Sequence, residues 1–362
     1  MKLLIRTKDI ARVVHRENHA IDTLSIYFTD GSSRTLSAEH YEESMSQRER
    51  CKQLVQAYKE ITEACKNEKE VDNFRIAHIK DGAAVTKFMY WLKQNVGKVR
   101  ITESDASAYI DGLRKEIGGG SFLGVSFETI GAYGANAAMV HYSAETGSNA
   151  EIKAEGMLLV DSGGHYLEGT TDITRTFALG RLTDEMKSHF TVTLRSMLNL
   201  AAAKFMEGCS GENLDILARE PMWKMGLDYR HGTGHGVGYL LSVHESPNSF
   251  RWRLREDLPR TAVLAEGMVT TDEPGVYIEG SHGIRIENEL LCKKAEKSEY
   301  GQLMEFEVLT YAPIDLDCVD VSQLEQRDRD RLNGYHRMVY GKLSPHFSGD
   351  ELEFLKRYTR EI

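Results

Sequence analysis

The chain has 362 residues, of which 41% are hydrophobic, enough to bury a sizeable core and to exclude a disordered chain. Asp and Glu (55) outnumber Lys and Arg (45), and the formal net charge of −10 argues against a nucleic-acid partner. Apolar runs stay far below the roughly 18 residues that span a bilayer, and residues 1–9 contain no signal-peptide core. We therefore expect no membrane association.

The five cysteines are an odd number, widely spaced and without a CxxC pair. This pattern indicates free thiols in a reducing compartment rather than a disulfide framework or a thiolate zinc site. It predicts a cytoplasmic protein.

The N-terminal part of the chain is predicted to form a small mixed unit. Residues 2–7 are a predicted strand, and the alternating residues 23–28 are a second strand that meets a hairpin turn at Asp30-Gly31. The charged stretch 37–65 is predicted to be helical.

Two helices are predicted next. In residues 68–94 the apolar side chains recur at the spacing of one helix face, with Val85, Phe88, Met89 and Leu92 as examples. Residues 103–117 follow a capping residue, Thr102, and end at three glycines, 118–120.

The remainder mixes strands and helices. A strand is predicted over 122–130 and a hairpin over 156–176, and residues 227–291 are strand-rich with a polar loop at 246–259. Helices are predicted over 183–207, 213–225 (shortened or kinked by Pro221), 328–342 and 350–358. Two rounds of helices followed by strands are compatible with two related halves without establishing them.

The first motif that could carry chemistry holds Asp161 at the end of an apolar strand and Asp172 at the start of the next. If the hairpin turns near Tyr166-Leu167, the two aspartates face each other across it, with Cβ atoms about 5 Å apart. Two carboxylates that close repel, and a divalent cation removes the conflict. For this pair alone, two solvated turn residues are the preferred interpretation.

The second motif is rich in glycine and histidine. His231 and His235 would share one face of a strand, because their separation is even, and His244 follows on the next stretch. The glycines do not form a phosphate-binding loop, since neither GxGxxG nor Gly-Lys-Ser/Thr is present. A lone histidine is more often packed in a core, but three within fourteen residues favour a site.

The third motif joins Glu273 to a strand in which Arg285, Glu287 and Glu289 point one way and apolar residues the other. A charged front of this kind is ordinary at a protein surface. We expect Arg285 to lie beside Glu287, as a cation next to a metal-binding carboxylate.

Together the motifs offer four carboxylates and one imidazole, from Asp161, Asp172, His235, Glu273 and Glu287. This oxygen-rich set without thiolates suits Mn²⁺, Fe²⁺ or Co²⁺ better than a structural zinc. Four carboxylates exceed the need of one ion, so two bridged ions that activate a water for hydrolysis are expected.

These motifs resemble the catalytic domain of aminopeptidase P, the X-Pro aminopeptidase, in its cytosolic type, a member of the pita-bread metallopeptidases. The resemblance rests on VDSGGHYLEGTTDITRTF from Val160, HGTGHGVG from His231 with VHESP, and TDEPGVYIEGSHGIRIENEL from Thr271. The segment from Lys66 to Leu92, MVHY at 139–142 and EFEVLTYAPID at 305–315 also fit.

The resemblance covers roughly residues 65–360 and implies an α+β pita-bread fold, with two pseudo-symmetric halves around a central cleft that holds two metals. It divides the chain into a catalytic domain over 66–362 and a small segment over 1–65. That segment matches no part of the long N-terminal region of the cytosolic enzymes, so its role and the oligomeric state, including a homodimer, stay open.

The resemblance also assigns roles to individual residues. Asp161 would bind one metal, Asp172 and Glu287 would bridge the two, and His235 and Glu273 would bind the other. Glu273 would also carry a proton to the leaving nitrogen, and Arg285 would hold a ligand carboxylate. The remaining three would contact the substrate: His141 and His244 in catalysis, and His231 beside the proline pocket.

The activity implied is hydrolysis of the bond between an N-terminal residue and a following proline, with a peptide substrate. The expected ions are two Mn²⁺, with Co²⁺, Fe²⁺ or Zn²⁺ as alternatives. A prolidase restricted to X-Pro dipeptides is the near alternative. A non-catalytic pita-bread module that binds proteins, or an acidic structural protein, is the alternative from another class.

Overall fold

A computed structural model describes residues 10–16, 21–28, 33–39, 63–240, 242–253 and 261–362. The chain divides into two compact units, residues 1–63 and 64–362. In the first, β1 (Ile10–Arg16), β2 (Ile21–Phe28) and β3 (Ser33–Glu39) form an antiparallel sheet in that order. The second strand was predicted.

Other predictions for the first unit differ or cannot be compared. The predicted strand 2–7, the Asp30-Gly31 turn and residues 40–62 of the predicted helix lie outside the described residues. Residues 37–39 were predicted to be helical, but they belong to β3, which pairs with β2 as far as Ile21 opposite Glu39. Pairing with a neighbouring strand overrides a local helical preference.

The second unit begins with two helices that local signals predicted correctly. Helix α2 (Glu68–Asn95) starts in a capping box, in which Asn67 and Glu70 each accept the other's backbone N–H. Helix α3 (Glu103–Gly118) starts in a second capping box at Thr102 and ends at Gly119, whose φ of 52° favours glycine.

The strands that follow form two small antiparallel sheets. The single strand predicted over 122–130 is two, β4 (Phe122–Val125) and β5 (Ile130–Tyr133), with a short helix, η3 (Gly134–Ala138), after them. The predicted hairpin is present as β6 (Met157–Ser162) paired with β9 (Ile173–Ala178), and β7 (Gly164–Tyr166) and β8 (Gly169–Thr170) lie between them. The sheets run β5-β6-β9 and β4-β7-β8.

The next helices are α4 (Asp184–Ala201) and α5 (Gly211–Trp223), which contains Pro221 in its last turn. The helix predicted over 183–207 is too long, because residues 204–206 form strand β10 (Lys204–Met206). That strand pairs with β17 (Gly301–Val308), about a hundred residues later in the chain. No signal in the neighbouring sequence predicts this pairing.

A six-stranded sheet forms the second half, in the order β10-β17-β16-β13-β11-β12. Its remaining strands are β11 (Gly234–Gly236), β12 (Glu245–Phe250), β13 (Val269–Asp272) and β16 (Asn288–Ser298), and β14 (Gly275–Ile278) pairs with β15 (His282–Arg285) beside it. The polar loop predicted from residue 246 begins as β12 instead. Its polar Asn248 is buried and donates to Val269 O and Thr270 Oγ1.

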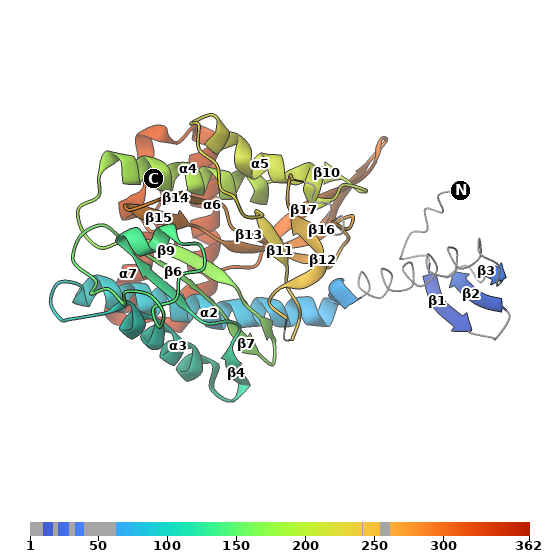
Figure 1. Ribbon diagram of the computed structural model, residues 1–362, viewed down its shortest axis with the longest axis horizontal. Helices are drawn as coiled ribbons and strands as arrows, with labels where there is room; N and C mark the ends of the chain where they lie inside the picture. Colours follow the sequence, from blue (N-terminus) through green and yellow to red (C-terminus); the bar gives the residue numbers. More distant parts are fainter. Residues whose placement is uncertain (1–9, 17–20, 29–32, 40–62, 241, 254–260) are drawn as a thin grey trace. The chain divides into compact units, whose positions relative to one another are not determined.

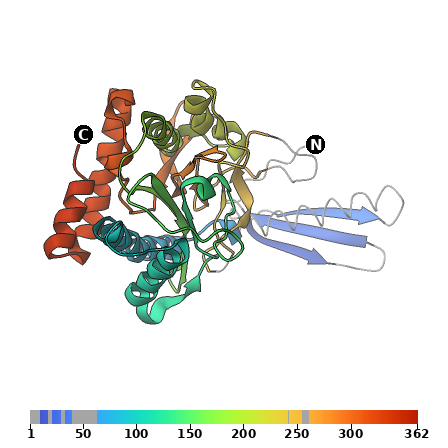
Figure 2. The same ribbon diagram turned by 60° about the vertical axis from the view of Figure 1, so that its left-hand side comes forward.

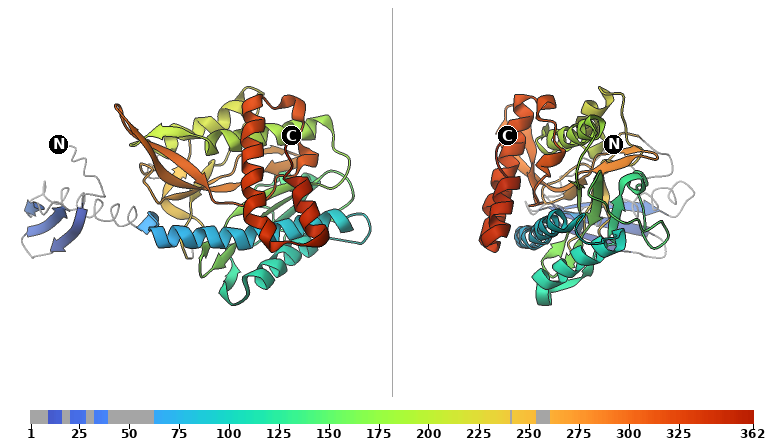
Figure 3. Two further views of the ribbon diagram at one scale, coloured as in Figure 1. Left: turned by 180° about the vertical axis from the view of Figure 1, so that it is seen from behind. Right: turned by 90° about the vertical axis from the view of Figure 1, so that its left-hand side faces the viewer.

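Helices cover the sheets of the second unit on several sides. α2 and α3 lie along one side and α4 and α5 along the other (Figure 1), and the strands occupy the interior between them (Figure 2). The C-terminal α6 (Gln326–Leu343) and α7 (Gly349–Tyr358), predicted within two residues at each end, pack across α2 and α4 on the face turned forward in Figure 3. The face of the sheets opposite α6 and α7 is not covered by these helices (Figure 3).

The described cysteines, at 65, 209, 292 and 318, are free thiols. Among the helices that the structure describes, none combines the length and apolarity needed to cross a bilayer.

Candidate metal centre

Eight of the nine predicted site residues line one cavity of about 450 Å³ in the second unit. They are Asp161, Asp172, Glu273, His141, His231, His235, His244 and Arg285. The ninth, Glu287, is 1% exposed and lies behind the cavity wall, next to Asp172 and His235. Three motifs that are far apart in the sequence therefore meet at one place.

Both halves of the unit contribute to the cavity. Asp161 lies on β6, and Asp172 comes directly before β9 in the same small sheet. His235 lies on β11, Glu273 follows β13, and Glu287 occupies the break between β15 and β16. The site therefore combines residues of two separate sheets with residues of the short connections next to their strands.

The two aspartates are not directly opposed, contrary to the prediction. Asp161 pairs with Thr174, so Asp172 is two positions out of register with it. The tip of the hairpin explains the shift, since β8 follows β7 after a turn at Leu167-Glu168, one residue later than predicted. The aspartates are still close enough that repulsion from Asp161 raises the pKa of Asp172, after the larger effect of burial.

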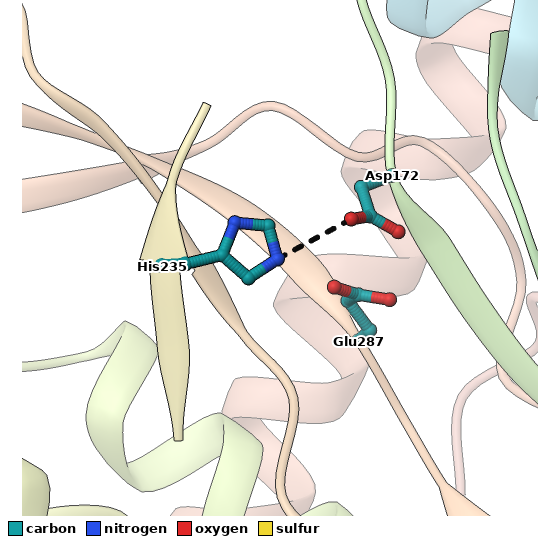
Figure 4. Close-up of side chains that lie close together, drawn as sticks. All are labelled: Asp172, His235 and Glu287. Carbon is teal, nitrogen blue, oxygen red and sulfur yellow. Dashed lines mark ion pairs between the residues drawn. The ribbon is translucent and has the colours of Figure 1, made fainter. Parts of the chain in front are cut away.

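Among the described residues, Asp172, His235 and Glu287 form a cluster that could hold a metal ion. Each offers a ligand atom within 4.8 Å of those of the other two, and the three side chains converge on a common point (Figure 4). His235 Nε2 lies 3.5 Å from Asp172 Oδ2 and 3.5 Å from Glu273 Oε1. One imidazole nitrogen thus faces two carboxylates at once.

Arg285 is buried at the back of the cavity and hydrogen-bonds to the carboxylate of a proposed ligand, Asp161, while it shares Thr174 Oγ1 with Glu287. Its Nη2 donates to Asp161 Oδ2 at 2.5 Å, and its Nη1 donates to the Tyr277 hydroxyl at 2.8 Å. The same hydroxyl is 2.9 Å from His231 Nε2. Arg285 therefore holds Asp161 directly and His231 through Tyr277.

Two threonines that were not predicted as site residues hold the other carboxylates. Thr174 Oγ1 donates to Glu287 Oε2 at 2.7 Å, and Thr271 Oγ1 donates to Glu273 Oε1 at 3.1 Å. Each lies two residues from a predicted ligand, Thr174 after Asp172 and Thr271 before Glu273. Side chains two apart in a strand share a face, so this spacing is the signal that could have found them.

Glu289 was predicted to share the charged face of its strand with Arg285 and Glu287. In the structure it hydrogen-bonds to the backbone of Asp172. Its Oε1 accepts the Asp172 backbone N–H at 2.7 Å, and its Oε2 lies 3.3 Å from Nε2 of the fully buried His78 on α2. His78 lies in the segment from Lys66 to Leu92 that supports the resemblance, but nothing in the sequence assigned it a role at the site. The pair fixes the backbone of Asp172.

The electrostatics of the cluster fit a bound cation. Burial, and then repulsion from Asp172, raises the pKa of Glu287 well above its ordinary value, and burial also raises the pKa of Glu273. Asp161 Oδ1 is buried without a hydrogen-bond partner. Unpaired buried charge is costly, and divalent ions with oxygen and imidazole ligands would remove both the repulsion and the unpaired atom.

The three remaining histidines differ in their surroundings. Burial, and then Arg285, lowers the pKa of His231 to about 4. The His244 ring centroid is 4.2 Å from that of His235, and partial burial lowers the pKa of His244. His141 is exposed and also lines the cavity. His231 and His244 are thus kept neutral near pH 7, when each can donate one hydrogen bond and accept another.

We predict that Arg285→Ala lowers both the melting temperature and the metal affinity. Asp161 would stay buried without its counter-charge, and loss of such a partner typically weakens metal affinity or activity about 10–100-fold. Thermal melts and metal titrations on one preparation measure both. The control is Arg100→Ala, because the Arg100 side chain is 73% exposed; a metal-binding curve for Arg285→Ala that matches this control would contradict the prediction.

The second unit is similar in sequence to known proteins. Residues 72–294 match the model of metallopeptidase family M24, and residues 302–362 match that of the C-terminal region of peptidase M24. Aminopeptidase P1 of Arabidopsis thaliana is 38% identical over 328 residues, which are 83% of this chain and 50% of that protein. The chain spans about half the length of such relatives.

Solved structures share the fold. The X-prolyl aminopeptidase of Caenorhabditis elegans, described as a cytosolic enzyme with a di-nuclear active site, superposes with a TM-score of 0.78 at 38% identity, over 83% of this chain and 49% of that one. The Xaa-Pro dipeptidase of Bacillus anthracis gives 0.59 at 26% identity, over 72% and 65%. The predicted α+β pita-bread fold is confirmed.

Proposed function

The chain belongs to metallopeptidase family M24, and from that premise we propose that it is a metal-dependent aminopeptidase that removes the N-terminal residue preceding a proline. The observation that carries the proposal is the convergence of Asp172, His235 and Glu287 on one point beside Glu273 and the incompletely paired Asp161. A protein-binding module has no need for so many unneutralised carboxylates in a cavity.

We propose that two divalent ions occupy the site, with Mn²⁺ as the expected metal and Co²⁺, Fe²⁺ or Zn²⁺ as alternatives. Asp161 would bind one ion, His235 and Glu273 would bind the other, and Asp172 and Glu287 would be shared by both. Bound ions of this kind lower the pKa of a water and polarise a carbonyl oxygen.

The side chains of the chain itself would do the remaining work. Glu273, beside His235, would accept a proton from the attacking water and deliver it to the imino nitrogen of the leaving proline. His141 and His244 would donate hydrogen bonds to the carbonyl oxygen as negative charge develops on it. His231, held by Tyr277, would line the pocket for the proline ring.

The prolidase alternative has the same fold, so the fold does not separate the two activities. The comparison favours the aminopeptidase, because identity is 38% with the X-prolyl aminopeptidase and 26% with the Xaa-Pro dipeptidase. The cytoplasm as location is supported by the free thiols and by the description of the Caenorhabditis elegans enzyme as cytosolic. We keep 66–362 as the proposed catalytic domain, with 1–65 and a homodimer unassigned.

The test is product analysis by mass spectrometry after incubation with an X-Pro-Y tripeptide, the X-Pro dipeptide and an X-Ala-Y control, each with and without Mn²⁺. We expect release of X from the tripeptide, dependent on the metal, and little cleavage of the control. Cleavage of the dipeptide alone would establish the prolidase. No cleavage by protein with a full complement of metal would overturn the proposal in favour of a binding module.

A further inference from the structure

A buried carboxylate that belongs to none of the motifs anchors the segment that carries His141. Glu103, the first residue of α3, is 0% exposed and lies outside the cavity lining. Both of its oxygens accept hydrogen bonds, and every donor comes from residues 133–150. His141 lies in the middle of that segment.

Hydrogen bonds to Glu103 hold both ends of the 133–150 segment. At its start, the Tyr133 N–H donates to Glu103 Oε1 at 2.7 Å, and Asn136 Nδ2 donates to the same oxygen at 2.9 Å. At its end, the Ala150 N–H donates to Glu103 Oε2 at 2.6 Å, while the Glu103 N–H donates back to Ala150 O at 3.1 Å. Hydrogen bonds to a charged acceptor are stronger than neutral ones.

The middle of the segment is tied down next to the histidine itself. The Tyr142 hydroxyl donates to Glu103 Oε2 at 2.6 Å and accepts the Asn149 N–H at 3.1 Å. The loop wraps closely around this ring, since a Cβ at Gly147 would lie 2.4 Å from it. Tyr142 is 4% exposed, whereas the neighbouring His141 is exposed at the cavity rim.

We infer that Glu103 is a positioning residue, which fixes His141 at the cavity rim through Tyr142 and the two ends of the 133–150 segment. The inference rests on the proposed function, because it takes His141 as a group that contacts the substrate. The cost of ordering an exposed eighteen-residue segment falls when its ends and centre share one buried acceptor.

Glutamine at this position cannot reproduce the arrangement. Each carboxylate oxygen accepts a backbone N–H, Tyr133 on one side and Ala150 on the other, and a backbone N–H cannot become an acceptor. The amide NH₂ of Glu103→Gln must therefore face one of these N–H groups. We expect His141 to shift, and a misplacement near 1 Å can lower the rate about 10²-fold.

The test is a double-mutant cycle with His141→Ala, measured as kcat/KM on an X-Pro-Y peptide at saturating Mn²⁺. Glu103→Gln should lose about 10–100-fold in the wild-type background and less than about twofold in the His141→Ala background, because coupled residues are not additive. Metal content should be unchanged. An equal loss in both backgrounds would show a merely structural role and overturn the inference.

The control is Asp105→Asn on the same helix, an exposed residue whose carboxylate caps α3 by accepting the Thr102 N–H. It should keep wild-type kcat/KM in both backgrounds. If Glu103→Gln fails to fold, Tyr142→Phe removes a single hydroxyl of the same network. Its loss of kcat/KM should be smaller and should again depend on the presence of His141. An equal loss with and without His141 would overturn the inference.

Hydrogen–deuterium exchange supplies a readout that does not depend on activity. In Glu103→Gln, amides of residues 133–150 should exchange faster, while those of α2 and the six-stranded sheet keep their protection. If the amides of residues 133–150 exchange at the wild-type rate in Glu103→Gln, Glu103 does not anchor the segment, whatever the activity of the variant. A wild-type protein that cleaves no peptide would instead overturn the proposed function, so the two failures are distinguishable.

Discussion

Glu287→Ala is expected to abolish peptide hydrolysis and to lower the amount of bound metal. Glu287 is 1% exposed, is held by Thr174, and lies with Asp172 and His235 in the cluster that could hold a metal ion. If it bridges two ions, its loss leaves both of them short of a ligand. Metal analysis of the purified variant and kcat at saturating Mn²⁺ measure the two effects.

Two further variants make this result specific. Glu287→Gln keeps the shape and the bond from Thr174 but removes the charge, and it should behave like the alanine variant. Glu279→Ala, in the exposed turn between β14 and β15, should behave like the wild type. Full activity of Glu287→Ala at saturating Mn²⁺ would rule out the bridging role.

His244→Ala is expected to lower kcat while both metals stay bound. His244 lines the cavity beside His235 and is not among the proposed ligands. Loss of one hydrogen-bond donor to the transition state typically lowers kcat about 10²–10³-fold, and a group that acts mainly in the transition state changes KM less. Metal content, kcat and melting temperature should be measured on the same preparation.

The alternative for His244 is that it only packs beneath Pro247, which lies in β12. In that case the variant would melt at a lower temperature, but its folded fraction would turn over at nearly the wild-type rate. The exposure of His244 argues against a packing role. His346→Ala, another exposed histidine far along the chain in η6 (Ser344–His346), is the matched control.

The elements predicted most accurately carry their own local signals. The capping boxes at Asn67 and Thr102 and the glycine after α3 mark the ends of two helices without help from the rest of the chain. Where the predictions were wrong, a distant partner decided the outcome. Residues 204–206 leave the predicted helix to pair with β17, and residues 37–39 pair with β2.

The same distinction applies to the site. The predicted ligands could be named because each lies in a short recognisable motif. Their supporting partners could not, because Thr174 meets Glu287 across 113 residues and Glu103 meets Tyr142 across 39. Arg285 was predicted to lie beside Glu287, its neighbour in the sequence, and the fold also brings Asp161 to it.

The ion pair between Arg285 and Asp161 has a consequence for how the protein is made. The two residues are separated by 124 positions, and Arg285 comes second. A chain emerging from the ribosome therefore completes β6 long before its counter-charge exists. Burying Asp161 without this partner would cost about 3–5 kcal/mol, and the cavity that buries it is lined by residues of the second half as well. We expect Asp161 to stay solvated until the second half has been synthesised, so that the site reaches its native packing only in the complete unit.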